Sequence, residues 1–232
     1  MSGREQDPAP LLSRRGRLVL IGACVVAVLI AVAYVTAQAS APGGPPVAQG
    51  QVRLGPDPGE PVADYLARLP ASLPTPGTRV SALVQLSAEI TTAQAATLAP
   101  SAVEAVFRVP IPRVQTALRF QLLTGGGEPA LTVAQAQALH AAEADAQRQT
   151  GRPAAVAAAE AAAYRGPSCA CIVALVVQAD RAGLDALAAT PGVRAVQAAP
   201  AGITARELAL SPLLPDQATA ATPPPDDGPL PS

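Results

Sequence analysis

One uninterrupted apolar run, residues 18–37, stands out from the rest of the chain. It reads LVLIGACVVAVLIAVAYVTA and contains no charged residue. Twenty residues of helix extend about 30 Å, which is the hydrocarbon thickness of a bilayer. A helix also satisfies its own backbone hydrogen bonds, which lipid cannot do. The pattern therefore predicts a single transmembrane helix over residues 18–37, with the lipid bilayer as its partner.

The arginines around this run predict its orientation. Arg4, Arg14, Arg15 and Arg17 precede it, whereas the first basic residue after it is Arg53. The positive-inside rule then places residues 1–17 in the cytoplasm and the bulk of the chain outside the membrane.

Cleavage of the N-terminal segment is an open alternative. Ala37-Gln38-Ala39 has the small-x-small form of a signal-peptidase site, which would release the chain after Ala39. The apolar run is longer than an ordinary signal sequence, and this length favours an uncleaved anchor.

Beyond the membrane run, apolar and polar residues alternate over Val80–Leu86 and again over Val103–Val109. Such alternation is typical of strands with one buried face. Between them, Thr91 and Gln94 have the spacing of a capping box, which predicts a helix over Thr92–Leu98. This segment is therefore expected to form a β-α-β unit.

A second unit of the same kind is expected near the end of the chain. Cys171–Gln178 is a nearly continuous apolar strand, Asp180 is a suitable helix N-cap, and Val193–Ala198 is the return strand. Two such units side by side predict an α+β fold, a ferredoxin-like (βαβ-βαβ) sandwich with an antiparallel sheet and helices on one face.

The residues between the two units predict an insertion. Arg113–Leu123 alternates and reads as an additional strand, while Thr132 and Gln135 form another capping box that opens a helix. A second, Ala-rich helix follows over residues 153–164, and we expect these helices to pack through alanine. The largest core side chains are expected to be Phe107 and Phe120.

Proline-rich segments flank the expected extracytoplasmic domain, residues 79–201. Residues 38–78 predict an extended Pro/Gly-rich stalk that contains a short amphipathic helix at 61–69. Residues 202–232 predict a disordered Pro-rich tail.

Charge and composition narrow the classes of function. Sixteen basic residues, all arginine, and 17 acidic residues give a formal net charge of −1, which disfavours nucleic acid as a partner. One histidine and three cysteines exclude a site with several histidine ligands. His140 lies in a helical stretch without a nucleophile nearby in sequence, so we expect it to face solvent. We expect neither a cofactor nor an enzymatic activity.

Cys169-Ala170-Cys171 is the one unusual chemical pattern in the chain. Four interpretations stay open: a strained disulfide between Cys169 and Cys171, two reduced and partly buried thiols, bridging between molecules, and binding of a soft metal such as Cu(I). An oxidising compartment outside the cytoplasm favours oxidation.

Three arginines cluster around the second and third expected strands of the domain: Arg108, Arg113 and Arg119. They are candidates for a basic patch that binds an acidic partner or anionic lipid. The alternative is that they are edge-strand charges, which discourage aggregation.

Residues 184–196, LDALAATPGVRAV, are similar to the final helix–turn–strand of subtilase propeptides and their inhibitor relatives. The similarity rests on six residues: Leu184, Leu187, Pro191, Gly192, Val193 and Val196. It implies a ferredoxin-like fold. Inhibition would also need a C-terminal segment that enters a protease cleft, and here Ala199-Pro200-Ala201-Gly202 follows instead of the acidic residues often found there.

These patterns together predict a single-pass, membrane-anchored protein with a non-catalytic extracytoplasmic domain that binds another protein or the cell envelope. Two alternatives belong to other classes. One is a thiol-dependent or metal-handling envelope protein that uses Cys169 and Cys171, and the other is a protease inhibitor of the subtilase-propeptide type.

Overall fold

The computed structural model describes residues 52–166 and 168–231. The predicted membrane segment, residues 18–37, lies outside these residues. Among the helices within them, none has both the length and the apolar character to cross a bilayer.

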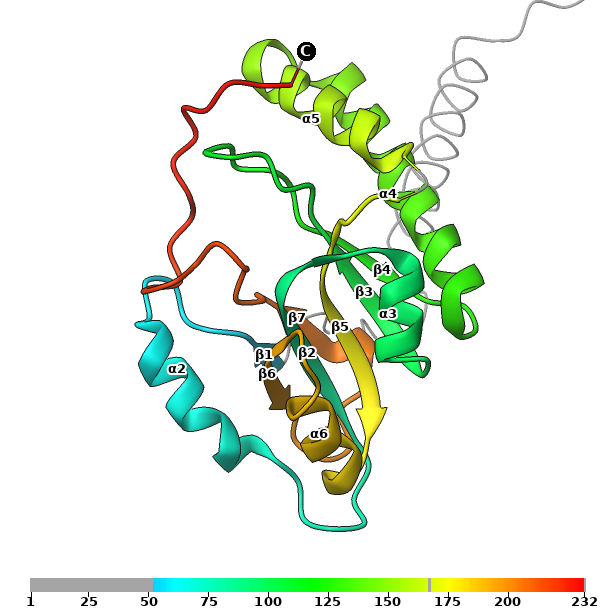
Figure 1. Cartoon of the computed structure of the whole chain (residues 1–232), viewed down its shortest axis with the longest axis vertical. Helices are drawn as coiled ribbons and strands as arrows, with labels where there is room; N and C mark the ends of the chain where they lie inside the picture. Colours follow the sequence, from blue (N-terminus) through cyan, green and yellow to red (C-terminus); the bar gives the residue numbers. More distant parts are fainter. Residues whose placement is uncertain (1–51, 167, 232) are drawn as a thin grey trace, which may run out of the picture. The chain divides into compact units, whose positions relative to one another are not determined.

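The described residues form a mixed α+β structure (Figure 1). Its helices and strands follow one another in this order: β1 (Val52–Leu54), α2 (Val62–Arg68), the 3-10 helix η1 (Leu69–Ser72), β2 (Val80–Ile90), α3 (Thr92–Leu98), β3 (Ala102–Phe107), β4 (Arg119–Leu122), α4 (Gly127–Arg148), α5 (Gly151–Tyr164), β5 (Ile172–Ala179), α6 (Arg181–Ala188), β6 (Val193–Ala198), the 3-10 helix η2 (Ala205–Glu207) and β7 (Leu208–Leu210).

The main sheet has five strands in the order β4-β3-β5-β2-β6, and every neighbouring pair is antiparallel. The four strands expected from alternation and apolar runs are confirmed as β2, β3, β5 and β6. The two expected β-α-β units lie side by side, because β2 pairs with β5 over most of its length, with Leu83 opposite Val176.

Local capping explains where the two short helices begin. The Thr91 hydroxyl accepts a hydrogen bond from the Gln94 N–H, and the Gln94 side chain accepts one from the Thr91 N–H, which is the expected capping box. The Asp180 carboxylate caps α6 through the Gly183 N–H at 2.9 Å.

The first inserted helix, α4, begins earlier than its predicted capping box. It starts at Gly127, so Thr132 lies within the helix and donates its hydroxyl to the Glu128 carbonyl. Gln135 instead donates its side-chain amide to the Tyr164 and Gly166 carbonyls at the end of α5. Thr132 and Gln135 therefore do not cap α4, because Thr132 bonds within the helix and Gln135 bonds to residues at the end of α5.

Helices cover one face of the sheet and build the larger core. As expected, α4 packs through alanine: Ala134, Ala138 and Ala142 are four residues apart and buried. Phe107 is fully buried, as predicted, and its ring meets the Tyr164 ring edge to face at 6.3 Å.

The expectation for Phe120 is wrong, because 43% of this residue is exposed. The expected strand over residues 113–123 is reduced to β4, since Arg113 has φ of +58° and breaks the extended backbone. Phe120 is opposite Val106, which packs on the sheet face away from the helices, so Phe120 lies on that face at the outermost strand.

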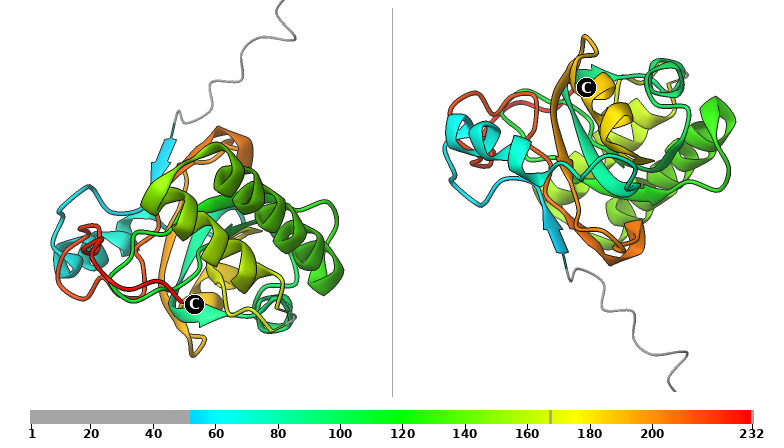
Figure 2. Two further views of the ribbon diagram at one scale, coloured as in Figure 1. Left: turned by 90° about the horizontal axis from the view of Figure 1, so that it is seen from above. Right: turned by 90° about the horizontal axis from the view of Figure 1, so that it is seen from below.

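The second face of the sheet is covered by segments that we expected to be a stalk and a disordered tail. Instead β1 pairs in parallel with β7, and Leu54 and Leu214 pack against the sheet residues Leu83 and Val176. Figure 2 shows the C-terminal segment running beside α2, where the Val62 N–H donates to the Thr219 carbonyl. The short helix expected at 61–69 is confirmed as α2. The apolar residues scattered among the prolines make this packing favourable.

Candidate functional site

One edge of the main sheet, strand β4, carries two exposed apolar side chains. Phe120 is 43% exposed and Leu122 is 46% exposed. They alternate with Arg119, which is buried on the helical face, so the two apolar side chains share the opposite face. Large apolar groups on an edge strand are unusual in a protein that has no partner for them.

The backbone of the same two residues also faces outward. Leu123 N–H donates to Val103 O on β3, so the odd-numbered residues of β4 direct their backbone groups inward to β3. In an antiparallel pair these directions alternate along the strand. The N–H and C=O groups of Phe120 and Leu122 therefore point away from β3, and no described strand pairs with them.

A hollow of about 300 Å³ lies beside this edge. Leu122 and the exposed Val133 of α4 line it together, and the turn at Gly125 and Gly126 closes one end. None of its lining residues is charged: Leu122, Thr124, Gly125, Gly126, Pro129, Ala130, Val133, Ala134 and Gln137. The hollow is therefore suited to an apolar side chain and not to an ion.

Buried ion pairs hold β4 in place. Arg119 reaches across the helical face and pairs with Glu160 of α5 at 2.6 Å and with Asp145 of α4 at 3.0 Å. Glu160 is almost fully buried and also accepts the Ala117 N–H. The edge strand is thus joined to both inserted helices.

A buried carboxylate lies beside the exposed pair. Glu104 of β3 is opposite Leu122 in the register and is only 7% exposed. Burial raises the pKa of Glu104 to about 7. This group changes its charge near neutral pH, and nothing in the sequence pattern distinguished it from an ordinary strand residue.

The three arginines predicted as a patch are each paired with an acidic group. Arg108 is buried and forms a two-pronged pair with Asp216, at 2.9 and 3.2 Å. Arg113 pairs with Asp227 on the surface, and Arg119 pairs with Glu160. Asp145 of α4 also pairs with Arg119, and Glu89 of β2 lies 3.7 Å from Arg108, so the charges of all three are locally balanced.

Cys169 and Cys171 are joined as a disulfide just before β5, with their Cα atoms 5.3 Å apart. That Cα separation lies within the usual range for a disulfide. The strand begins at Ile172, so neither cysteine is held in the extended spacing that the sequence suggested. His140 is exposed and lies 3.4 Å from Glu143, its neighbour on the helix.

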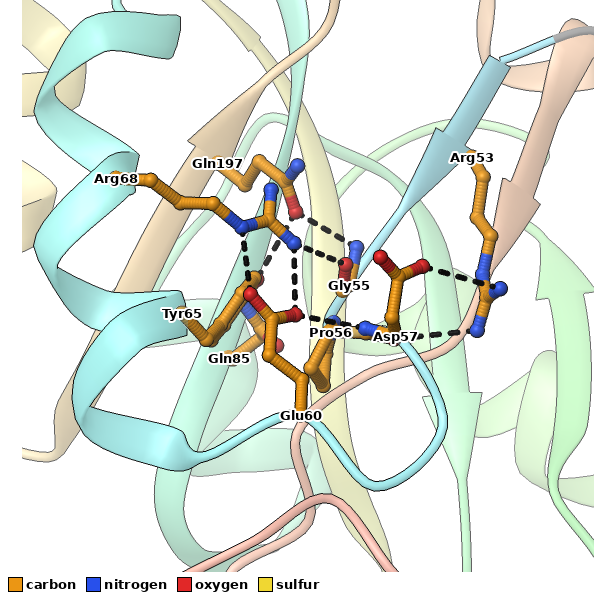
Figure 3. Close-up of polar contacts among 9 residues, drawn as sticks. All are labelled: Arg53, Gly55, Pro56, Asp57, Glu60, Tyr65, Arg68, Gln85 and Gln197. Atoms are coloured by element: carbon orange, nitrogen blue, oxygen red, sulfur yellow. Dashed lines mark hydrogen bonds and ion pairs between the residues drawn. The ribbon is translucent and has the colours of Figure 1, made fainter.

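A second polar cluster, drawn in Figure 3, joins α2 and the segment after β1 to the sheet. The buried Tyr65 hydroxyl accepts a hydrogen bond from the Gln85 amide at 2.6 Å and donates one to the Gln197 side-chain oxygen at 2.9 Å. Gln197 also accepts the Gly55 N–H, and Gln85 accepts the Leu213 N–H. These hydrogen bonds hold Tyr65 of α2, Gly55 beside β1 and Leu213 of the C-terminal segment on the sheet, so this cluster is structural.

The outer layer of the same cluster is charged. Arg68 lies over the Tyr65 ring, 4.9 Å from its centre, and binds Glu60 at 2.8 and 2.9 Å. The hydrogen bond from Arg68 is the main reason that the pKa of Glu60 falls to about 2. Figure 3 shows this pair closing over the buried tyrosine and glutamines.

No group of three or more His, Cys, Asp or Glu side chains within the described residues is arranged to hold a metal ion. Comparisons with protein families, with curated proteins and with solved structures found no match to this chain. Among the described residues, those of the β4 edge best support a binding surface, because both their side chains and their backbone groups are exposed.

Proposed function

We propose that this chain is a single-pass membrane protein whose extracytoplasmic α+β domain binds another protein and does not catalyse a reaction. The observation that carries the proposal is the edge of β4, where Phe120 and Leu122 expose both their apolar side chains and their backbone groups. An exposed apolar surface of this kind supports recognition of a partner.

Membrane attachment rests on the sequence of residues 18–37 and on the arginines that precede them. The 14 residues from 38 to 51 separate that segment from β1. Such a spacer reaches at most about 50 Å when fully extended. The domain would then work close to the membrane surface, on partners in or near the envelope.

We also propose a ferredoxin-like topology for the sheet. Four of its strands belong to two β-α-β units, and their order, β3-β5-β2-β6, interleaves the two units as that topology requires. Strand β4 and helices α4 and α5 form the insertion between the units. The proposed binding edge therefore belongs to the insertion and not to the common core of the topology.

The inhibitor alternative has an observation against it. The segment after β6 folds back on its own sheet, where Ala199 N–H donates to Ser81 O at 2.8 Å. Further along, Leu213 is fully buried. A segment held in this way is not presented to a protease cleft.

The thiol-dependent alternative depends on Cys169 and Cys171, whose sulfurs are paired with each other. Alkylation of the full chain with and without reductant, followed by mass measurement, separates a stable disulfide from reactive thiols. If Cys169→Ser and Cys171→Ser variants lose the cellular phenotype while folding normally, the thiol-dependent function replaces our proposal.

External protease tests the location of the domain. We expect protease added to intact cells to cleave the region from Arg79 to Ala201, and cleavage only after lysis would contradict the proposed orientation.

Photo-crosslinking in cells tests binding at the edge. A photoreactive residue at position 120 should form an adduct with another protein, whereas one at Arg181, on the surface of α6, serves as the control. Equal adducts from both positions, or none from position 120, would reject β4 as the binding surface.

A further inference from the structure

We infer that the β4 edge binds an extended peptide of a partner protein as an additional antiparallel or parallel strand, with one apolar side chain in the hollow between Leu122 and Val133. This inference rests on the proposed binding function and specifies the chemistry of the partner. It differs from docking on a flat apolar patch, because it requires main-chain hydrogen bonds to β4.

The backbone supplies the first half of the site. Phe120 and Leu122 each direct one N–H and one C=O away from β3. An extended peptide alongside can pair with these groups without disturbing the existing sheet. Strand addition of this kind provides affinity through the main chain and is largely independent of peptide sequence.

The side chains supply selectivity. Successive residues of an added strand point to opposite faces of the sheet. On one face they lie beside Phe120 and Leu122, which are both exposed. On the helical side the next residue meets the hollow beside the end of β4, where α4 contributes Val133 and Gln137. The preferred peptide therefore has apolar residues on both faces and no charge at the position that enters the hollow.

A second copy of the chain fits this edge less well than a peptide does. Its β4 strand would present Arg119 and Gln121 toward the helical side. Arg119 is buried in ion pairs with Glu160 and Asp145 and cannot leave them to fill an uncharged hollow. The occupant is therefore an extended segment of a different protein.

The test uses the purified full chain in detergent and a phage library of random eight-residue peptides as the probe. Selected peptides are synthesised with a fluorophore, and their affinity is measured by anisotropy. We expect enriched peptides to have apolar residues on both faces of the added strand, no charge at the position that enters the hollow, and no proline at the paired positions.

Four variants separate the components of the site. Leu122→Ala removes a side chain, whereas Leu122→Pro also removes an outward N–H without breaking a bond to β3. We expect the proline variant to bind about tenfold more weakly than the alanine variant. Val133→Asp should weaken binding at least tenfold by placing a charge in the hollow. Gln147→Asp lies about 21 Å further along α4 and should have no effect.

N-methylation of the peptide provides a measurement that does not depend on how the variants fold. Strand addition predicts loss of binding at every second peptide position, because only alternate N–H groups face β4. Loss with Val133→Asp but without this period of two would overturn strand addition while leaving a binding surface. Failure to enrich any peptide would also overturn it, and the crosslinking from position 120 would still decide the proposed function separately.

Discussion

Two buried tyrosines should contribute differently to the free energy of unfolding. Both are buried, but the Tyr65 hydroxyl joins Gln85 to Gln197, whereas the Tyr164 hydroxyl has no hydrogen-bond partner among the described residues. We expect Tyr65→Phe to lower the free energy of unfolding by about 1–3 kcal/mol, because it leaves a buried amide unpaired. Tyr164→Phe should change it by less than about 0.5 kcal/mol.

Urea unfolding of both variants at neutral pH checks this comparison. Because each variant removes one hydroxyl from one buried ring, each is the control for the other. Equal losses would mean that the Tyr65 hydrogen bonds shown in Figure 3 add no more stability than the unpaired Tyr164 hydroxyl does.

Glu104 should make stability depend on pH. Its pKa is about 7 in the folded protein, above the ordinary value of 4.5. Unfolding is therefore favoured increasingly as pH rises from about 4.5 to 7, and the full cost, on the order of 3 kcal/mol, is present above pH 7. Glu104→Gln should stabilise the protein at pH 8 and have little effect at pH 4.

Thermal unfolding at the two pH values measures the effect of Glu104→Gln. The exposed Glu128 of α4 provides the matched control, and Glu128→Gln should give nearly the same shift at both pH values. A gain from Glu104→Gln that is independent of pH would contradict the role of ionisation.

At the scale of elements, the ion pair between Arg119 and Glu160 holds the edge strand to α5. Arg119→Met leaves the Glu160 carboxylate buried without its cation, and we expect a loss of about 3–5 kcal/mol in the free energy of unfolding. Adding Glu160→Gln should recover most of that loss, because the amide oxygen still accepts the Ala117 N–H. Urea titrations of the single and double variants form a double-mutant cycle.

If the double variant is as unstable as Arg119→Met alone, packing of the arginine stem would account for the loss.

The pair between Arg119 and Glu160 also explains why an acidic residue occurs in the alanine-rich helix α5. Glu160 is the only charged residue between Pro153 and Tyr164, and an acid within an alanine-rich, largely buried helix needs a partner.

Elements that depend on interactions between residues close in sequence could be predicted, whereas elements that depend on distant residues could not. Strands β2, β3, β5 and β6 and the caps at Thr91 and Asp180 depend on neighbouring residues, and all were predictable. The start of α4 was not, because Gln135 bonds to the end of α5.

The candidate site on β4 could not be predicted either, because it too depends on contacts between residues distant in sequence. Alternation identified the two faces of β4 but not which face the helices cover, so Phe120 was assigned to the core. The helices pack on the other face through a large apolar core, and there Arg119 pairs with Glu160, 41 residues away in the sequence. The lone acid in α5 indicates that a cation is needed, but it does not identify Arg119 of β4 as that cation.

At the scale of the whole molecule, the C-terminal segment completes the second face of the sheet. Leu213 is fully buried, and its N–H donates to Gln85, 128 residues away. Leu213→Ala should therefore lower the free energy of unfolding by about 2–5 kcal/mol. A disordered tail, as composition alone suggested, predicts no change. Thr222→Ala, at an exposed position of the same segment, is the control for nonspecific effects.

Removing the whole segment should have a larger consequence than any single substitution in it. Deletion of residues 202–231 uncovers Leu83 and Val176, which lie at the centre of the sheet, and it removes the strand that pairs with β1. Fully burying one leucine contributes about 1.5–3 kcal/mol, and net stabilities of domains are about 5–15 kcal/mol. Several such losses exceed that margin. The truncated chain should therefore bind a dye for exposed apolar surface and lose its cooperative thermal transition, and a sharp transition near that of the full chain would mean that the tail is not part of the folded unit.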